Sequence, residues 1–223
     1  MGRLAALGSG GRDAGQAFPV YIATIAGLLF LAFVYFAVGQ AASTRNGAQT
    51  AADAAALAAA QDAREQLRTG WLEVLADPEQ WDAFLGGRKY DDAPACQAAA
   101  VFAGRNGAEL SGAGCSRLPL GDEGFAVTVR TTGTVGDSIV PGTESQHVSA
   151  SAKAVIEPKC SFDPLEEPTS DPSPTEPDEE QGEEDEPILG LTCDGEPWEI
   201  DPDSPTLPSA VDLFAVRLIG DNE

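Results

Sequence analysis

The sequence predicts an α+β protein that is anchored in a membrane by one N-terminal helix. Three observations lead to this prediction: a long uncharged apolar segment, an alanine-rich helical segment directly after it, and two later stretches in which apolar and polar residues alternate. We expect a single transmembrane helix that extends as a stalk. A small disulfide-bonded head should follow, built from helix and antiparallel sheet and carrying a disordered acidic loop.

The apolar segment places the chain in a membrane. No charged residue occurs between Ala14 and Thr44, and the centre, residues 17–39, is apolar throughout. A helix that crosses a hydrocarbon core of ~30 Å needs roughly 20 residues, which this segment supplies. Arg3 and Arg12 precede the span and favour a cytoplasmic N-terminus, so the long C-terminal part should be extracytoplasmic.

A cleaved signal peptide is the competing interpretation of this segment. The small residues Gly39 and Ala41 are compatible with a cleavage site. The apolar region of a signal peptide, however, usually has about 7 to 15 residues, which is shorter than the segment found here. We therefore expect a retained anchor.

The segment after the span is expected to continue as a helical stalk. Ala48, Ala52, Ala55 and Ala59 recur at spacings of three and four, which aligns them on one helix face. Such a face lets another helix pack closely; alternatively, the alanines only support helicity. Asp53 should lie on the polar side of this helix, and would need an amide or arginine partner if it were buried.

The head is predicted from the pattern beyond residue 70. An aromatic cluster around Trp71 and Trp81, interrupted at Pro78, is expected in the core. Helical propensity returns in residues 95–103, and alternating strands follow at residues 125–130 and 146–157. Residues 198–200 and 212–219 regain strand character, so the C-terminal tail should return to the sheet as a third strand.

The acidic charge is concentrated in one segment. The formal net charge is −23, which excludes a nucleic-acid partner because phosphate backbones are bound through Lys and Arg. Residues 162–187 contain no basic residue and almost no apolar one. They cannot bury enough surface to offset the cost of ordering, so we expect a disordered loop. Calcium binding by this run, or by Asp194, Asp201 and Asp203, is the alternative.

Four cysteines follow the span, and an even number outside the cytoplasm is usually a set of disulfides. Three pairings are possible. We favour Cys96 with Cys115 and Cys160 with Cys193, because each pair closes a neighbouring loop. A zinc site is the alternative, but the chain has no CxxC spacing and its single histidine is distant in sequence from every cysteine.

No catalytic pattern is found in the sequence, and we expect neither an enzyme nor a cofactor. His147 is the single imidazole, but it falls on the polar face of a predicted strand, where a solvated side chain is the simpler interpretation. The chain contains no nucleophile elbow, phosphate-binding loop or paired metal-ligand motif.

Two blocks of residues carry a family resemblance. Gly15, Gln16 and Ala17 open the apolar helix, and the second block comprises Gln49, Ala51, Ala52, Asp53, Ala54, Ala55, Leu57, Ala58 and Ala59. These blocks resemble the N-terminal region of TadG-like (TadE/TadG-related) proteins of the tight-adherence Flp, or type IVb, pilus assembly system. The resemblance implies an envelope-anchored accessory or minor pilin-like component. It also suggests processing between Gly15 and Gln16, although Val20 stands where prepilin-peptidase substrates carry Glu.

The expected organisation follows from these observations. Partners should be the membrane and other pilus assembly proteins, reached through the stalk helix and the head, with a possible oligomer through the membrane helix. The alternative function is a membrane-anchored extracytoplasmic binding module unrelated to pili. The expected divisions are a cytoplasmic N-terminus (1–15), transmembrane helix (16–40), stalk (41–69), head (70–161), acidic loop (162–187) and returning C-terminal segment (188–223).

Overall fold

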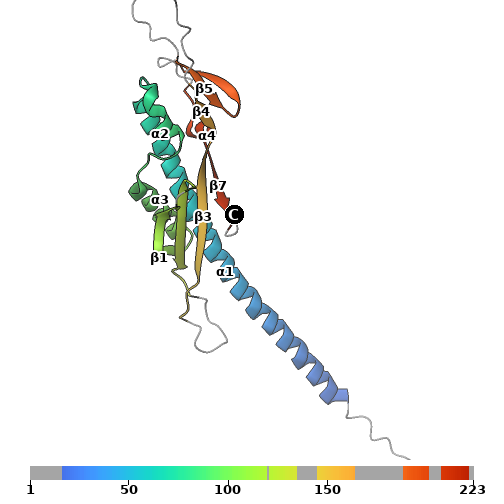
Figure 1. The fold of residues 1–223 in the computed structure, drawn as a ribbon. Helices are drawn as coiled ribbons and strands as arrows, with labels where there is room; N and C mark the ends of the chain where they lie inside the picture. The colour runs from blue at the N-terminus through green and yellow to red at the C-terminus, as the bar shows by residue number, and fades with distance from the viewer. Residues whose placement is uncertain (1–16, 120, 135–144, 164–187, 201–206, 221–223) are drawn as a thin grey trace, which may run out of the picture.

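The computed structural model describes residues 17–119, 121–134, 145–163, 188–200 and 207–220. One long helix, α1 (Ala17–Glu73), dominates the molecule, and a head is gathered on its C-terminal half (Figure 1). Its 57 residues give a length of about 85 Å at 1.5 Å per residue. The N-terminal half projects alone, whereas the C-terminal half forms the centre of the head (Figure 1). The α+β class expected from the sequence is confirmed.

The remaining elements follow in a simple order. After α1 come the short 3-10 helix η1 (Pro78–Gln80) and two α-helices, α2 (Trp81–Leu85) and α3 (Asp92–Arg105). The main sheet has the order β1-β2-β3-β7 and is antiparallel throughout. Its strands are β1 (Ala108–Arg117), β2 (Gly124–Thr131), β3 (Ser149–Pro158) and β7 (Phe214–Ile219). A second antiparallel sheet contains β4 (Cys160–Phe162), β5 (Ile188–Cys193) and β6 (Glu196–Ile200), and α4 (Ala210–Leu213) precedes β7.

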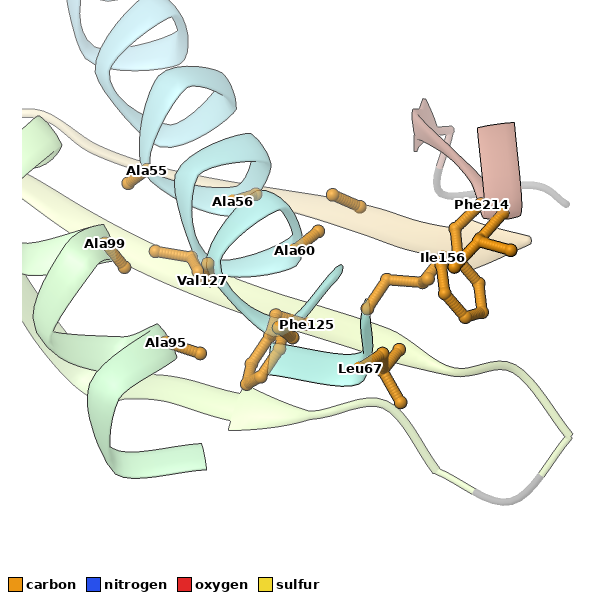
Figure 2. Packing of buried hydrophobic residues seen from close by; sticks show 14 of the residues in the cluster. Ala55, Ala56, Ala60, Leu67, Ala95, Ala99, Phe125, Val127, Ile156 and Phe214 are labelled. Atoms are coloured by element: carbon orange, nitrogen blue, oxygen red, sulfur yellow. The ribbon is translucent and has the colours of Figure 1, made fainter. Parts of the chain in front are cut away.

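The two strands predicted by alternation both occur; β2 is one residue longer at each end than predicted, and β3 begins at Ser149, three residues later than predicted. Phe125, Val127 and Val129 of β2 are buried, as are Ala154 and Ile156 of β3. These side chains meet α1 in the core shown in Figure 2. The sheet therefore covers the helix with its apolar face, as the period of two residues requires.

The C-terminal tail returns to the main sheet, as predicted, but only through β7. Residues 214–219 pair with β3, with Phe214 opposite Pro158 and Ile219 opposite Lys153. Trp198 and its neighbours instead belong to the second sheet, which lies at the end of the head away from the projecting half of α1 (Figure 1). The strand β1 was not predicted, because its sequence AELSGAGCSR has no regular alternation of apolar residues.

The aromatic cluster lies in the core, at the C-terminal end of α1. Trp71 and Trp81 are fully buried and meet edge to face, with ring centroids 5.2 Å apart. The ring of Phe162 from β4 lies 4.6 Å from that of Trp81. A side chain at Gly70 would collide with the ring of Phe84, so glycine lets α2 approach α1. Aromatic packing thus ties the second sheet and α2 to the end of the long helix.

The expected stalk is not a separate part of the molecule. Residues 48–69 of α1 contribute many of the buried residues of the head, including Leu67. The helix continues through the head to Glu73. The alanine-rich segment is therefore the central core helix, because its small face is covered by the strands and helix that follow it in sequence.

Candidate functional site: the two halves of the long helix

The N-terminal half of α1 has the character of a membrane span. Its large apolar side chains are exposed, from Phe18 near the beginning to Val38 near the end of the apolar segment. None of the most apolar window of this helix is buried, and its mean hydropathy is 2.3. Side chains of this kind are stable in a hydrocarbon environment and not in water. The expected processing residues, Gly15 and Gln16, lie outside the described residues, as do Arg3 and Arg12.

The predicted alanine face is fully buried within the chain itself. Ala48, Ala52, Ala55 and Ala59 each have 0% exposure. Further alanines widen this face. Helix α3 packs on one part of it, and strands β2 and β3 pack on another part (Figure 2). These additional residues, all without exposure, are Ala51, Ala56, Ala60 and Ala63.

The helix that packs closely on this face is α3 of the same chain. Its buried residues, Ala95, Ala99 and Ala103, recur every four residues, so alanine meets alanine between the two helices (Figure 2). The sequence predicted a face that another helix can approach closely, and this helix proves to be α3 of the same chain. Other pilus assembly proteins were expected to be reached through the stalk helix, but the part of its surface covered by α3 and the sheet is not open to a partner.

Gln49 joins the long helix to the main sheet. Its amide nitrogen Nε2 donates to Asp53 Oδ1 at 2.8 Å and to the backbone carbonyl of Ser151 at 3.2 Å. Strand β7 ends opposite Lys153, so Ser151 of β3 lies beyond the end of its neighbour. Gln49 therefore covers an open position on the edge of β3. Asp53 is half-buried, and the Gln49 amide is its partner.

Arg117 holds the segment before α3 against the sheet. From β1, its guanidinium donates to Asp92 Oδ1 at 2.7 Å and to the carbonyls of Tyr90 at 2.8 Å and Arg88 at 3.3 Å. It also lies over the Tyr90 ring, 3.8 Å from the centroid. One cation thus satisfies two backbone carbonyls and a carboxylate, as the fork of an arginine allows. Sequence reasoning did not single out Arg117, because its partners are brought to it only by the fold.

Burial controls the ionisation of Tyr90. Desolvation raises the pKa of its phenol to about 12, the Glu123 carboxylate adds to the rise, and the Arg117 cation opposes it. The phenol oxygen donates to Glu123 Oε2 at 3.3 Å, and the ring packs against that of Phe125 at 5.7 Å. Tyr90 is consequently neutral at physiological pH.

A groove of about 830 Å³ lies between the C-terminal part of α1 and the segment before α3. Carboxylates of Asp62, Glu65 and Glu73 line the α1 side, and the other side carries cationic residues together with the Asp91 carboxylate. Arg88 is paired with Asp82 at 2.6 Å, while the ammonium of Lys89 lies 4.5 Å from the Phe84 ring centroid. The walls are of mixed charge and are suited to a polar partner.

Both cysteine pairs have the connectivity favoured from the sequence. Cys96 of α3 is bonded to Cys115 of β1, and Cys160 of β4 to Cys193 of β5. The first bond fixes the helix α3 to the adjacent edge strand. The second joins directly opposed residues of the small sheet and closes the loop that contains the acidic run.

Two other polar residues considered from the sequence, His147 and Asp194, have partners within the head. A ring nitrogen of His147, Nδ1, lies 2.7 Å from the carbonyl oxygen of Thr131, so the side chain is half-buried and not fully solvated. Asp194 pairs with Lys159 at 2.8 Å. Within the described ranges, no three His, Cys, Asp or Glu side chains are grouped to hold a metal ion. The acidic run from residue 164, Asp201 and Asp203 lie outside those ranges.

Comparison with protein families gives a match to the N-terminal part of the chain. Residues 15–62 match the family described as Putative Flp pilus-assembly TadE/G-like. The resemblance inferred from the two sequence blocks is thereby confirmed for this segment. The match includes the membrane-type half of α1 and the beginning of the half buried in the head. Comparisons with curated proteins and with solved structures give no match.

Proposed function

We propose that this chain, whose N-terminal segment is TadE/G-like, is a non-enzymatic, membrane-anchored accessory or minor pilin-like component of Flp pilus assembly. The family match supports an involvement in Flp pilus assembly. The proposed role as an anchored accessory or minor pilin-like component rests on one observation. The matched residues 15–62 join a membrane-type helix to the core of a folded head. A protein of this form presents the head next to the membrane surface, on the same helix that forms its apolar segment.

The remaining parts of the proposal concern orientation and partners. The N-terminus is cytoplasmic and the head extracytoplasmic, which is supported by the two disulfides in the head. The exposed apolar half of α1 lies in the bilayer, where it contacts lipid or the helices of other assembly proteins. Partners outside the membrane are met through the outer surface of the head, since the alanine face is occupied.

A deletion experiment tests the role in assembly. We expect cells that lack this chain to carry fewer surface pili, and the full chain supplied on a plasmid to restore them. A second strain should carry the chain with residues 18–38 replaced by an unrelated leucine and alanine sequence of equal length. If the span contacts assembly partners, this variant stays in the membrane but does not restore pili. Normal pilus numbers after deletion would overturn the proposal.

An anchored binding module unrelated to pili is the second candidate, favoured by the groove of about 830 Å³. The two functions differ in which part of the chain must keep its own amino-acid sequence, the span or the groove. A binding module tolerates exchange of the span and loses function when groove residues such as Lys89 and Glu73 are changed. Retained pili together with loss of another surface phenotype would favour this candidate.

A further inference from the structure

Residues 40–47 of α1 connect the apolar segment to the head, and within the described part of the chain they are almost wholly exposed. The apolar segment ends at Gly39, and the first buried residue of the head is Ala48. All eight residues between them are exposed except Thr44, which is half-buried. The described side-chain hydrogen bonds here are local: Thr44 Oγ1 donates to the Gln40 carbonyl at 3.1 Å, and Thr50 Oγ1 to the Asn46 carbonyl at 3.0 Å.

The same eight residues have the weakest helix propensity of the water-exposed part of α1. Ser43, Thr44, Asn46 and Gly47 are poor helix formers, whereas residues 51–60 consist almost entirely of alanine and leucine. Packing does not explain Gly47, because a Cβ at this position would meet nothing within 4 Å. Threonine hydroxyls bonded to the carbonyl four residues earlier also favour bending.

We propose that residues 40–47 form a hinge about which the head reorients relative to the membrane span. Opening a helical hydrogen bond within the bilayer is unfavourable because no water replaces it. Residues beyond Ala48 are held by α3 and the sheet. Between these two regions water can solvate an opened carbonyl or amide, so bending concentrates there. The hinge requires a membrane-inserted span and is independent of any role in pili.

Hydrogen exchange on the full chain in lipid nanodiscs tests the hinge. We expect the amides of residues 44–47 to exchange at least about tenfold faster than those of residues 55–60, which are held by packing. The double substitution Asn46→Ala and Gly47→Ala replaces two weak helix formers with the strongest. It should slow exchange of these amides by about tenfold, according to the difference in propensity.

A matched control and a second measurement make the test specific. Gly27→Ala also adds a methyl group into open space, but within the span, and should leave exchange at residues 44–47 unchanged. A fluorophore at exposed Gln97 of α3 reports the distance from the head to labelled lipid headgroups by energy transfer. Its distance distribution should narrow in the double variant and not in the control.

Three results would each overturn the hinge. The first is slow exchange at residues 44–47 in the unmodified chain, equal to that of residues 55–60. The second is an exchange rate unaffected by the double substitution. The third is an unchanged distance distribution in a variant whose exchange has slowed, since head motion would then arise elsewhere. None of these depends on pilus number, so failure of the hinge is distinguishable from failure of the proposed function.

Discussion

Individual polar side chains in the head bind backbone carbonyls that have no partner within a helix or between strands. Gln49 covers the Ser151 carbonyl at the end of β7, and Arg117 satisfies the carbonyls of Arg88 and Tyr90 in an irregular segment. The Tyr90 carbonyl is part-buried, so leaving it without a partner would cost about 1 to 3 kcal/mol, whereas the other two carbonyls lie in exposed positions. Gln49 also belongs to the sequence block that resembles TadG-like proteins, so part of that block has a direct structural role.

The first prediction concerns the ionisation of Tyr90. Unfolded tyrosine loses its proton near pH ~10, whereas burial raises the pKa of Tyr90 to about 12. The folded state therefore favours the protonated phenol. Its contribution to stability is complete below pH ~10 and is lost as the pH rises through the folded pKa of about 12.

Ultraviolet absorbance of the phenolate checks this prediction in the full chain. The difference between the titrations of the unmodified chain and the Tyr90→Phe variant isolates the signal of this one residue. We expect the difference to appear well above pH ~10 in the folded protein and near pH ~10 after denaturation. A difference signal centred near the ordinary tyrosine value in the folded state would contradict the assigned burial.

The partner of a residue could be predicted from the sequence only where residue type or spacing indicates the pair. The amide partner of Asp53 lies one helical turn away, and the two disulfides join consecutive cysteines of a set of four, a residue type that itself indicates pairing. The partners of Arg117 instead come from about 25 to 29 residues away, as with Asp92 and Arg88. No local spacing indicates such a contact, because the turn between α3 and β1 creates it.

At the scale of elements, α1 serves two environments with one continuous helix. Its first half exposes large apolar residues, and its second half buries alanines. The difference in side-chain size matches the difference in surroundings: lipid accepts bulky side chains, whereas α3 and the sheet approach the backbone closely. The sequence indicated both the helix and the small face, but not that the partner of the face was the same chain.

The second prediction concerns Ala52 and Ala55 on this buried face. Replacing both with Leu preserves helix propensity within a few tenths of a kcal/mol but inserts bulk between α1, α3 and the sheet. Overpacking typically costs ~1 to 3 kcal/mol per site. We therefore expect the head to lose about 2 to 6 kcal/mol of stability, measured by chemical denaturation in detergent, and to become sensitive to protease.

The matched control lies on the opposite side of the same helix. Thr50 and Gln61 are exposed and three turns apart, so a Thr50→Leu and Gln61→Leu variant adds similar bulk without entering the core. Its stability should remain near that of the unmodified chain. Equal stability of both double variants would show that the alanine face is not closely packed in solution.

The missed elements also have a physical explanation. Strand β1 contains Gly112 and Gly114 at positive φ, within an irregularity of its register with β2. An edge strand with such a bulge need not alternate apolar and polar residues. The short strands β4 and β5 are fixed by Cys160 and Cys193, which lie opposite one another, more than by a hydrophobic pattern.

At the scale of the whole molecule, the fold separates a helix that is long and apolar enough to span a membrane from a disulfide-bonded head. All four cysteines are paired, and the head contains them all. Such bonds persist in oxidising compartments and are rare in the cytoplasm. The arginines before the span favour a cytoplasmic N-terminus by a separate argument, that of charge bias. Both arguments give the same orientation.

The last prediction is that protease added to intact protoplasts removes the head. Cleavage should leave a small fragment that carries the N-terminus and the span, because the bilayer protects residues 17–39. A cytoplasmic protein in the same sample must stay intact, which shows that the membrane is closed. Reduction of the disulfides beforehand should speed cleavage, since each bond contributes ~2 to 4 kcal/mol to a small domain. A head that survives until lysis, in both oxidised and reduced samples, would place it in the cytoplasm and reverse the proposed orientation.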